Sequence, residues 1–304
     1  MDTSSKDIAN RSKLFALSAS LTLAAISAIA PTAQAATYSL DFNSSADGGS
    51  ILYNGDGTLN TTQWESWGLK DITGSNNYTN KEAKFNVYNT SIYNNNRDNR
   101  DWDLTTGTFK KGGNWIDTGT EKQGGALIIQ EESDSGSYKN GVYAADDEAK
   151  GGEIFFDFDR AVSLNSFSLL DIEDNGGGIM VEGTRAADGE IFRIDIDALI
   201  AKHYKDNGRE EGTATQGTSV TIDGVKMTQV GYLQDDNSMY RFDIDDAYLT
   251  DVRFSYPGSG AISGLEWGTL DVPQEIPEPS AIGGLLMLGF IGKRLKSRRD
   301  EAAA

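Results

Sequence analysis

Cysteine is absent from this chain of 304 residues, which also has one histidine, His203, and five prolines. Without cysteine the chain has no disulfide framework, no zinc thiolate site and no thiol nucleophile. A single imidazole excludes sites that need two, including most catalytic zinc and non-haem iron centres. The fold must therefore be held together by packing alone.

The residue types that are abundant in the chain favour β structure. Hydrophobic residues make up 38% of the chain and aromatic residues 10%, enough for a proper core. The 34 glycines are scattered among Asn, Asp and Ser, as expected for short strands joined by many turns. We expect an all-β fold with one mature domain, because β-sandwiches often exceed two hundred residues.

The charge is strongly acidic and unevenly placed. The net charge is −19, and residues 36–276 hold 19 basic and 41 acidic side chains, a net of −22. A field of that sign repels phosphate backbones, so no nucleic-acid partner is expected. The acidity fits a cation ligand, or simply the solubility of an exported protein.

The N-terminal 35 residues have the order of a secretory signal peptide. Three basic residues precede an apolar run from Leu14 to Ala30, and Ala33 and Ala35 form an A-x-A site. We expect signal peptidase to cut there, so that the mature chain begins near Ala36. The alternative is an N-terminal anchor that stays uncut.

A second short apolar segment follows the signature Pro277-Glu278-Pro279. It runs from Ala281 to Ile291, and a basic cluster that includes Arg298 and Arg299 comes after it. Eleven residues reach only about 16 Å, roughly half of the hydrocarbon thickness, so permanent anchoring as a transmembrane helix is not expected. The basic cluster is typical of a stop-transfer signal that keeps the tail cytoplasmic.

This arrangement resembles the PEP-CTERM sorting domain of Gram-negative bacteria and cyanobacteria. The resemblance implies transient membrane insertion, recognition of Pro277, Glu278 and Pro279 by an exosortase-like membrane protease, and release to the cell surface or extracellular matrix. The alternative is an amphipathic tail lying on the membrane. The predicted organisation is a signal peptide (1–35), a β-sandwich domain (36–272) and a sorting segment (273–304).

Alternating apolar and polar residues predict about ten or more short strands in the mature domain. Clear examples are residues 38–42, 154–158, 192–196 and 252–256; further candidates are 85–88, 126–130, 166–172, 179–182 and 261–267. Asp223-Gly224 predicts a two-residue hairpin turn between 219–222 and 225–230. The one expected helix is Asp197 to Lys205. A sandwich or jelly roll fits this pattern.

Three strand-like pieces carry pairs of aspartates on alternate residues. The pairs are Asp157 and Asp159, Asp195 and Asp197, and Asp243 and Asp245. Each pair shares one face of its strand, and paired carboxylates suit Ca²⁺. Asn54-Gly55-Asp56-Gly57 and Glu173-Asp174-Asn175-Gly176 also resemble parts of calcium loops. The alternative is a solvated outer face without metal.

The polar stretch from Asn43 to Gly125, with fewer clean strands, is the expected binding region. It contains Trp64, Trp67, Trp102 and Trp115. Exposed indoles can stack on the apolar faces of sugar rings, whereas buried ones would plug the ends of the core.

Catalysis has little support in the sequence. His203 is expected at an exposed helix end, which does not favour a Ser-His-Asp arrangement. We therefore expect an exported, non-catalytic surface or matrix protein that binds extracellular polysaccharide, with calcium as a structural ion. The alternative is a secreted glycoside hydrolase or lyase on a jelly-roll scaffold, since that chemistry needs only two carboxylates.

Overall fold

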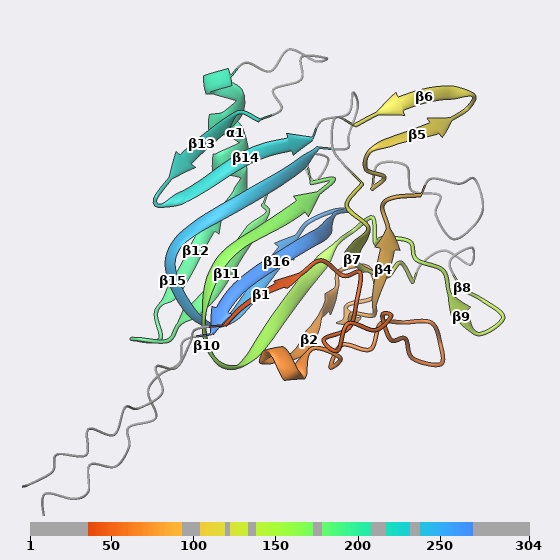
Figure 1. Ribbon diagram of the computed structural model, residues 1–304, viewed down its shortest axis with the longest axis horizontal. Helices are drawn as coiled ribbons and strands as arrows, with labels where there is room; N and C mark the ends of the chain where they lie inside the picture. Colours follow the sequence, from red (N-terminus) through yellow and green to blue (C-terminus); the bar gives the residue numbers. More distant parts are fainter. Residues whose placement is uncertain are drawn as a thin grey trace, which may run out of the picture. The chain divides into compact units, whose positions relative to one another are not determined.

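Long antiparallel strands dominate the structure, confirming the all-β prediction (Figure 1). The computed structural model describes residues 36–92, 104–118, 122–132, 138–172, 178–207, 217–231 and 238–269. The strands are β1 (Thr37–Leu40), β2 (Leu69–Asn76), β3 (Lys81–Glu82), β4 (Phe85–Asn89), β5 (Thr108–Lys111), β6 (Asn114–Asp117), β7 (Gly125–Ile129), β8 (Tyr138–Lys139), β9 (Val142–Tyr143), β10 (Gly152–Leu170), β11 (Met180–Arg185), β12 (Ile191–Asp195), β13 (Ser219–Ile222), β14 (Val225–Gly231), β15 (Met239–Tyr256) and β16 (Ala261–Thr269). A 3₁₀ turn, η1 (Glu65–Trp67), and one helix, α1 (Ile196–Asn207), complete the described elements.

Two strands organise the large sheet. β10 has 19 residues and β15 has 18, and they pair with each other along nearly their whole length. The first part of β10 also pairs with β2, and its second part pairs with β16. In the same way β15 pairs with β14 at its start and with β11 at its end. The two long strands therefore belong to two half-sheets.

The change from one half-sheet to the other coincides with breaks in strand register. The pairing of β10 with β15 shifts between Asp157 and Val162 and again between Leu164 and Ser166. Such bulges bend a strand and increase its twist. Residues 154–158 and 166–172 were predicted as separate strands, but the extended chain continues through the bulges from Gly152 to Leu170.

Aromatic side chains join the two half-sheets in one core. Phe167 of β10 stacks on its cross-strand neighbour Phe242, with ring centroids 4.6 Å apart. It also meets Phe254 edge-on at 5.1 Å, although Phe254 pairs in register with Ile154 near the other end of β10. The Phe167–Phe254 contact therefore connects the two half-sheets through the interior.

The helix and its neighbouring hairpin follow the sequence predictions closely. α1 extends the predicted helix by one residue at its start and two at its end, and Asp195 accepts a hydrogen bond from the Ala198 N–H in its first turn. The β13–β14 hairpin turns at Asp223 and Gly224, whose φ angles are 48° and 81°. Positive φ at both positions is the two-residue hairpin geometry that Asp-Gly favours.

Candidate binding site

A tight turn between Tyr53 and Leu59 forms one wall of the candidate site. The Asn54 N–H donates to the Thr58 carbonyl at 2.7 Å, and the Asn54 amide donates to the Thr58 hydroxyl at 3.1 Å. Asp56 accepts hydrogen bonds from both the Thr58 hydroxyl (2.6 Å) and the Thr58 N–H (3.1 Å). The bond from the Thr58 hydroxyl lowers the pKa of the Asp56 carboxyl. The carboxylate therefore serves to close the turn.

Two neighbouring strands hold this turn in place. The Leu59 N–H donates to the Phe85 carbonyl at 2.8 Å, and the Tyr143 N–H donates to the Asp56 carbonyl at 2.8 Å. Gly57 has a φ of +82°, and a Cβ there would lie 2.6 Å from a Val142 methyl group. A glycine is thus required where the β8–β9 hairpin packs on the turn.

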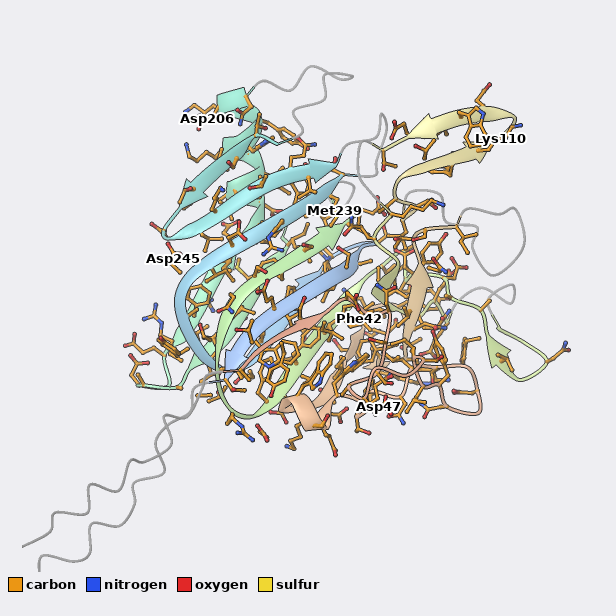
Figure 2. All side chains as sticks on the ribbon, viewed as in Figure 1. Phe42, Asp47, Lys110, Asp206, Met239 and Asp245 are labelled. Carbon is orange, nitrogen blue, oxygen red and sulfur yellow. The ribbon has the colours of Figure 1, made fainter. Side chains whose placement is uncertain are left out.

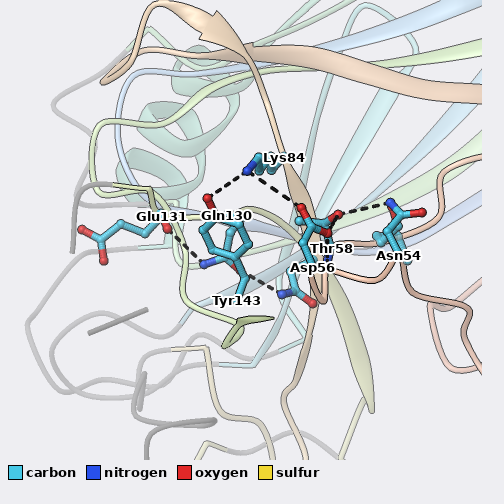
Figure 3. A network of polar contacts seen from close by, with 9 residues as sticks. Asn54, Asp56, Thr58, Lys84, Gln130, Glu131 and Tyr143 are labelled. Atoms are coloured by element: carbon cyan, nitrogen blue, oxygen red, sulfur yellow. Dashed lines mark hydrogen bonds and ion pairs between the residues drawn. The ribbon is translucent and has the colours of Figure 1, made fainter. Parts of the chain in front are cut away.

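Lys84 connects the same elements through its side chain (Figure 3). Its Nζ donates to the Tyr143 hydroxyl at 2.8 Å and lies 3.9 Å from an Asp56 carboxylate oxygen. The hydrogen bond to Tyr143 is the main cause that raises the pKa of Lys84, so the ammonium stays charged. The turn, the residue that precedes β4, and β9 therefore share one polar network.

Beside this network lies a pocket of about 280 Å³. Its polar lining consists of Asn54, Thr58, Thr61, Asp71, Thr73, Glu82 and Lys84. Its apolar lining consists of Leu59, Ile72, Ala83 and Phe85. A lining that combines apolar side chains with hydroxyl, amide, carboxylate and ammonium groups can hold a small polyhydroxylated ligand.

The predicted tryptophans occupy different environments. Trp64 is fully buried and its indole N–H donates to the Ser44 carbonyl at 3.0 Å, so it belongs to the core and offers no face to a sugar. Trp67 is half-buried and stacks on Tyr38 at 5.7 Å. Trp115 lies on β6 and is 73% exposed. Trp102 lies outside the described residues.

The predicted aspartates do not converge on a common point. Asp157 pairs with Lys70, Asp159 with Arg160, and Asp243 with Arg241, each at 2.7 or 2.8 Å. The remaining three lie at the start of α1 or on the surface: Asp195 caps the helix, Asp197 accepts from the Gly178 N–H, and Asp245 is exposed. The described residues contain no group of three His, Cys, Asp or Glu side chains that could hold a metal ion.

The turn Asn54–Gly57, expected as part of a calcium loop, instead uses its carboxylate within the chain, as described above. The other such fragment, residues 173–176, lies outside the described residues. No observation in the described part of the chain therefore favours a bound calcium ion.

The prediction of a surface histidine was wrong. His203 is fully buried on α1, and its Nε2 lies 2.7 Å from the Thr218 hydroxyl oxygen. Its ring also meets those of Tyr204 and Tyr240 edge-on. Polar neighbours at Lys202 and Lys205 in the sequence suggested exposure, but one face of the helix packs inward. Burial lowers the pKa of His203.

Sequence reasoning did not find the Lys84–Tyr143 contact that completes the site. These residues are 59 positions apart, and neither stands in a recognisable motif. The predicted processing residues Ala33, Ala35, Pro277, Glu278, Pro279, Arg298 and Arg299 all lie outside the described residues. Among the residues that are described, no helix has the length and apolar character needed to cross a membrane.

No protein family, curated protein or solved structure matches this chain. The class that the structure itself defines is an acidic, all-β protein built on a large antiparallel sheet. The resemblance of its C-terminal segment to a sorting domain stays a prediction.

Proposed function

We propose that this chain is an exported, non-catalytic protein of the cell surface or extracellular matrix, and that its β domain binds polysaccharide. Signal peptidase would act at Ala33 and Ala35, and an exosortase-like protease would act at the PEP-CTERM-like segment. The mature protein would then lie outside the cell after transient membrane insertion of its precursor.

One observation carries the export proposal. The Thr269 N–H donates to the Ala36 carbonyl at 2.8 Å, and β1 pairs with β16 from Thr37 to Leu40. The first residue after the expected signal-peptide site is therefore fixed to the last described residue before the sorting segment. The pair lies inside both expected processing sites, so processing there would leave the pairing of β1 with β16 in place.

The closure of the β domain into a sandwich or jelly roll is part of this proposal. It is supported by the Phe167–Phe254 contact between the two half-sheets and by the bulges that bend β10 and β15. Strands that pass from one layer to the other through bulges are typical of sheets packed across each other. Such closure also leaves fewer unpaired edges on a protein outside the cell.

The pocket beside Lys84 supports polysaccharide as the ligand. Sugar rings present hydroxyl groups around the edge and apolar C–H faces, and the pocket offers partners for both. The Asp56–Thr58 and Lys84–Tyr143 contacts fix this wall before any ligand arrives. Binding in a preorganised site loses less conformational entropy.

A secreted glycoside hydrolase or lyase is the second candidate. It is favoured by the presence of two carboxylates, Asp71 and Glu82, in the lining of the same pocket. The acid of a glycosidase typically lies in apolar surroundings, however, whereas Glu82 is exposed and Asp71 is half-buried. The non-catalytic proposal is therefore preferred.

The sorting proposal is tested by replacing Pro277 and Pro279 with Ala in cells that express the protein. We expect the precursor to stay unprocessed in the membrane fraction, whereas a Ser280→Ala control is processed normally. Normal release of the double proline variant, seen on a fractionation blot, rejects the sorting assignment.

The binding proposal is tested on a glycan array with and without chelator. We expect sugar binding, and we expect Lys84→Gln to weaken it. Lys226→Gln, which removes an exposed lysine on β14, should leave the binding unchanged. Reducing-end assays on the bound glycan, with Asp71→Asn and Glu82→Gln, separate a binder from an enzyme. If no glycan is bound at all, the protein has a purely structural role.

A further inference from the structure

One face of the β5–β6 hairpin carries a tryptophan, a lysine, a threonine and an aspartate. Its register pairs Lys110 with Trp115 and Thr108 with Asp117, and cross-strand partners lie on the same face of a hairpin. All four of these side chains are exposed. Figure 2 shows Lys110 on this hairpin, away from the large sheet.

The opposite face fixes the hairpin on the protein. Phe109 is only 5% exposed, and its cross-strand partner Ile116 is half-buried. At the base, the Gly107 N–H donates to the Thr118 hydroxyl at 2.8 Å, and Thr118 is itself buried. The face that carries Trp115 is therefore held toward solvent.

Trp115 is the most exposed large apolar side chain among the described residues, at 73%. The Lys110 Nζ lies 5.9 Å from the centroid of its ring. An exposed indole offers a flat apolar face on which the C–H face of a sugar ring can stack. The lysine places a positive charge over one face of the ring, so the other face is the one that a ligand can stack on.

Among the described residues of the hairpin and its base, the charge is opposite to that of the domain. Lys110 and Lys111 lie on the hairpin and the Lys122 side chain lies close to Gly107 at its base, whereas Asp117 is the one acidic residue of this described part. Residues 36–276 as a whole carry a net charge of −22. The lysines give an anionic chain a local partner despite the acidity of the domain, and the apolar C–H faces of its sugar rings match the exposed indole.

We infer that this hairpin binds an anionic polysaccharide, one that carries carboxylate groups on its sugar rings. Trp115 stacks on the apolar face of a ring, Lys110 pairs with the carboxylate, and Thr108 and Asp117 bond ring hydroxyl groups. This inference rests on the proposed polysaccharide-binding function and adds the ligand class and a second contact region to it.

The experiment is affinity electrophoresis of the full chain in native gels that contain polygalacturonate or neutral dextran. We expect retardation by polygalacturonate that weakens as NaCl is added, since the charge pair is exposed. Trp115→Ala should weaken binding about tenfold, with recovery in Trp115→Tyr, and Lys110→Gln should weaken it about threefold.

Two matched controls remove similar groups elsewhere. Tyr248→Ala removes an aromatic side chain that is 40% exposed, and Lys226→Gln removes an exposed lysine. Both should bind as the wild type does. Because Trp115 is exposed, Trp115→Ala should unfold at the same urea concentration as wild type, which excludes misfolding as the cause of weaker binding.

Three outcomes overturn the inference. If Trp115→Ala binds polygalacturonate as tightly as wild type while Lys84→Gln does not, the hairpin is no binding site but the proposed function stands. If the chain binds phosphatidylglycerol vesicles and no polysaccharide, the hairpin is a membrane contact. If nothing is bound, both the inference and the proposed function fail.

Discussion

The Thr269 N–H donates to the Ala36 carbonyl at 2.8 Å, although the two residues are 233 positions apart in the chain. Next to this bond, Trp267 of β16 lies 5.7 Å from Tyr38 of β1, between ring centroids. The indole N–H of Trp267 donates to the Trp67 carbonyl at 3.4 Å. The pairing of β1 with β16 is thus joined to the core.

This arrangement predicts a sharp limit for truncation. A chain that starts at Ala36 should have the same urea midpoint as the full-length chain, because every residue of β1 remains. A chain that starts at Asp41 loses β1, including Leu40, which is only 1% exposed. We expect it to be destabilised by more than about 2 kcal/mol. Equal urea midpoints for the two chains would show that β1 contributes nothing.

Phe167 is predicted to be among the most costly residues to truncate. Phe167→Ala removes a ring that is 1% exposed and that touches both half-sheets, so we expect a loss of about 3–5 kcal/mol. Trp115→Ala, which removes a larger but exposed ring, should cost less than about 0.5 kcal/mol. Urea denaturation measures both. Similar costs for the two variants would contradict the packing described here.

The buried His203 predicts a pH dependence. Burial lowers its pKa, so the unfolded chain binds the proton more readily than the folded chain. The stability that neutral, buried His203 contributes to the fold is fully present above its ordinary pKa of 6.5. This stability is lost as the pH falls toward the lowered pKa of His203 in the folded chain. His203→Gln should therefore show a smaller fall in stability from pH 7 to pH 5 than wild type. Parallel urea midpoints for both proteins would contradict this.

The Asp56 turn predicts a second pH effect, in a lower range. The hydrogen bond from Thr58 lowers the pKa of Asp56, so its contribution to stability is present above the ordinary value of 3.8 and is lost below it. Asp56→Asn should be less stable than wild type at pH 6, and the difference should shrink as pH falls through this range. Asp245→Asn, which removes a carboxylate at an exposed position, serves as the control for the loss of one charge and should be as stable as wild type at pH 6.

Local patterns predicted most elements of the fold. The Asp223-Gly224 turn, the helix around Leu199 and the alternation of Ile154, Phe156 and Phe158 follow from rules that act within a few residues. The continuity of β10 was not predictable, because bulges have no clear sequence signal. Strand β2 was also missed: its pattern Leu69–Asn76 alternates poorly.

The candidate site was less predictable than the fold. The sequence predicts residues 54–57 as part of a calcium loop. Their observed role depends on Lys84 and Tyr143, which reach the turn only through tertiary packing. Whether Trp64 is buried and Trp115 exposed depends in the same way on packing between distant segments. Composition alone does not distinguish the two.

The central claim is that the protein is exported and processed on both sides of the Ala36–Thr269 pair. The most direct test is the intact mass of the protein recovered from the cell surface or the medium. We predict a species that begins at or near Ala36 and lacks the apolar and basic residues after Pro279. Recovery of the unprocessed chain from the cytosol, with residues 1–35 and 280–304 still attached, would contradict it.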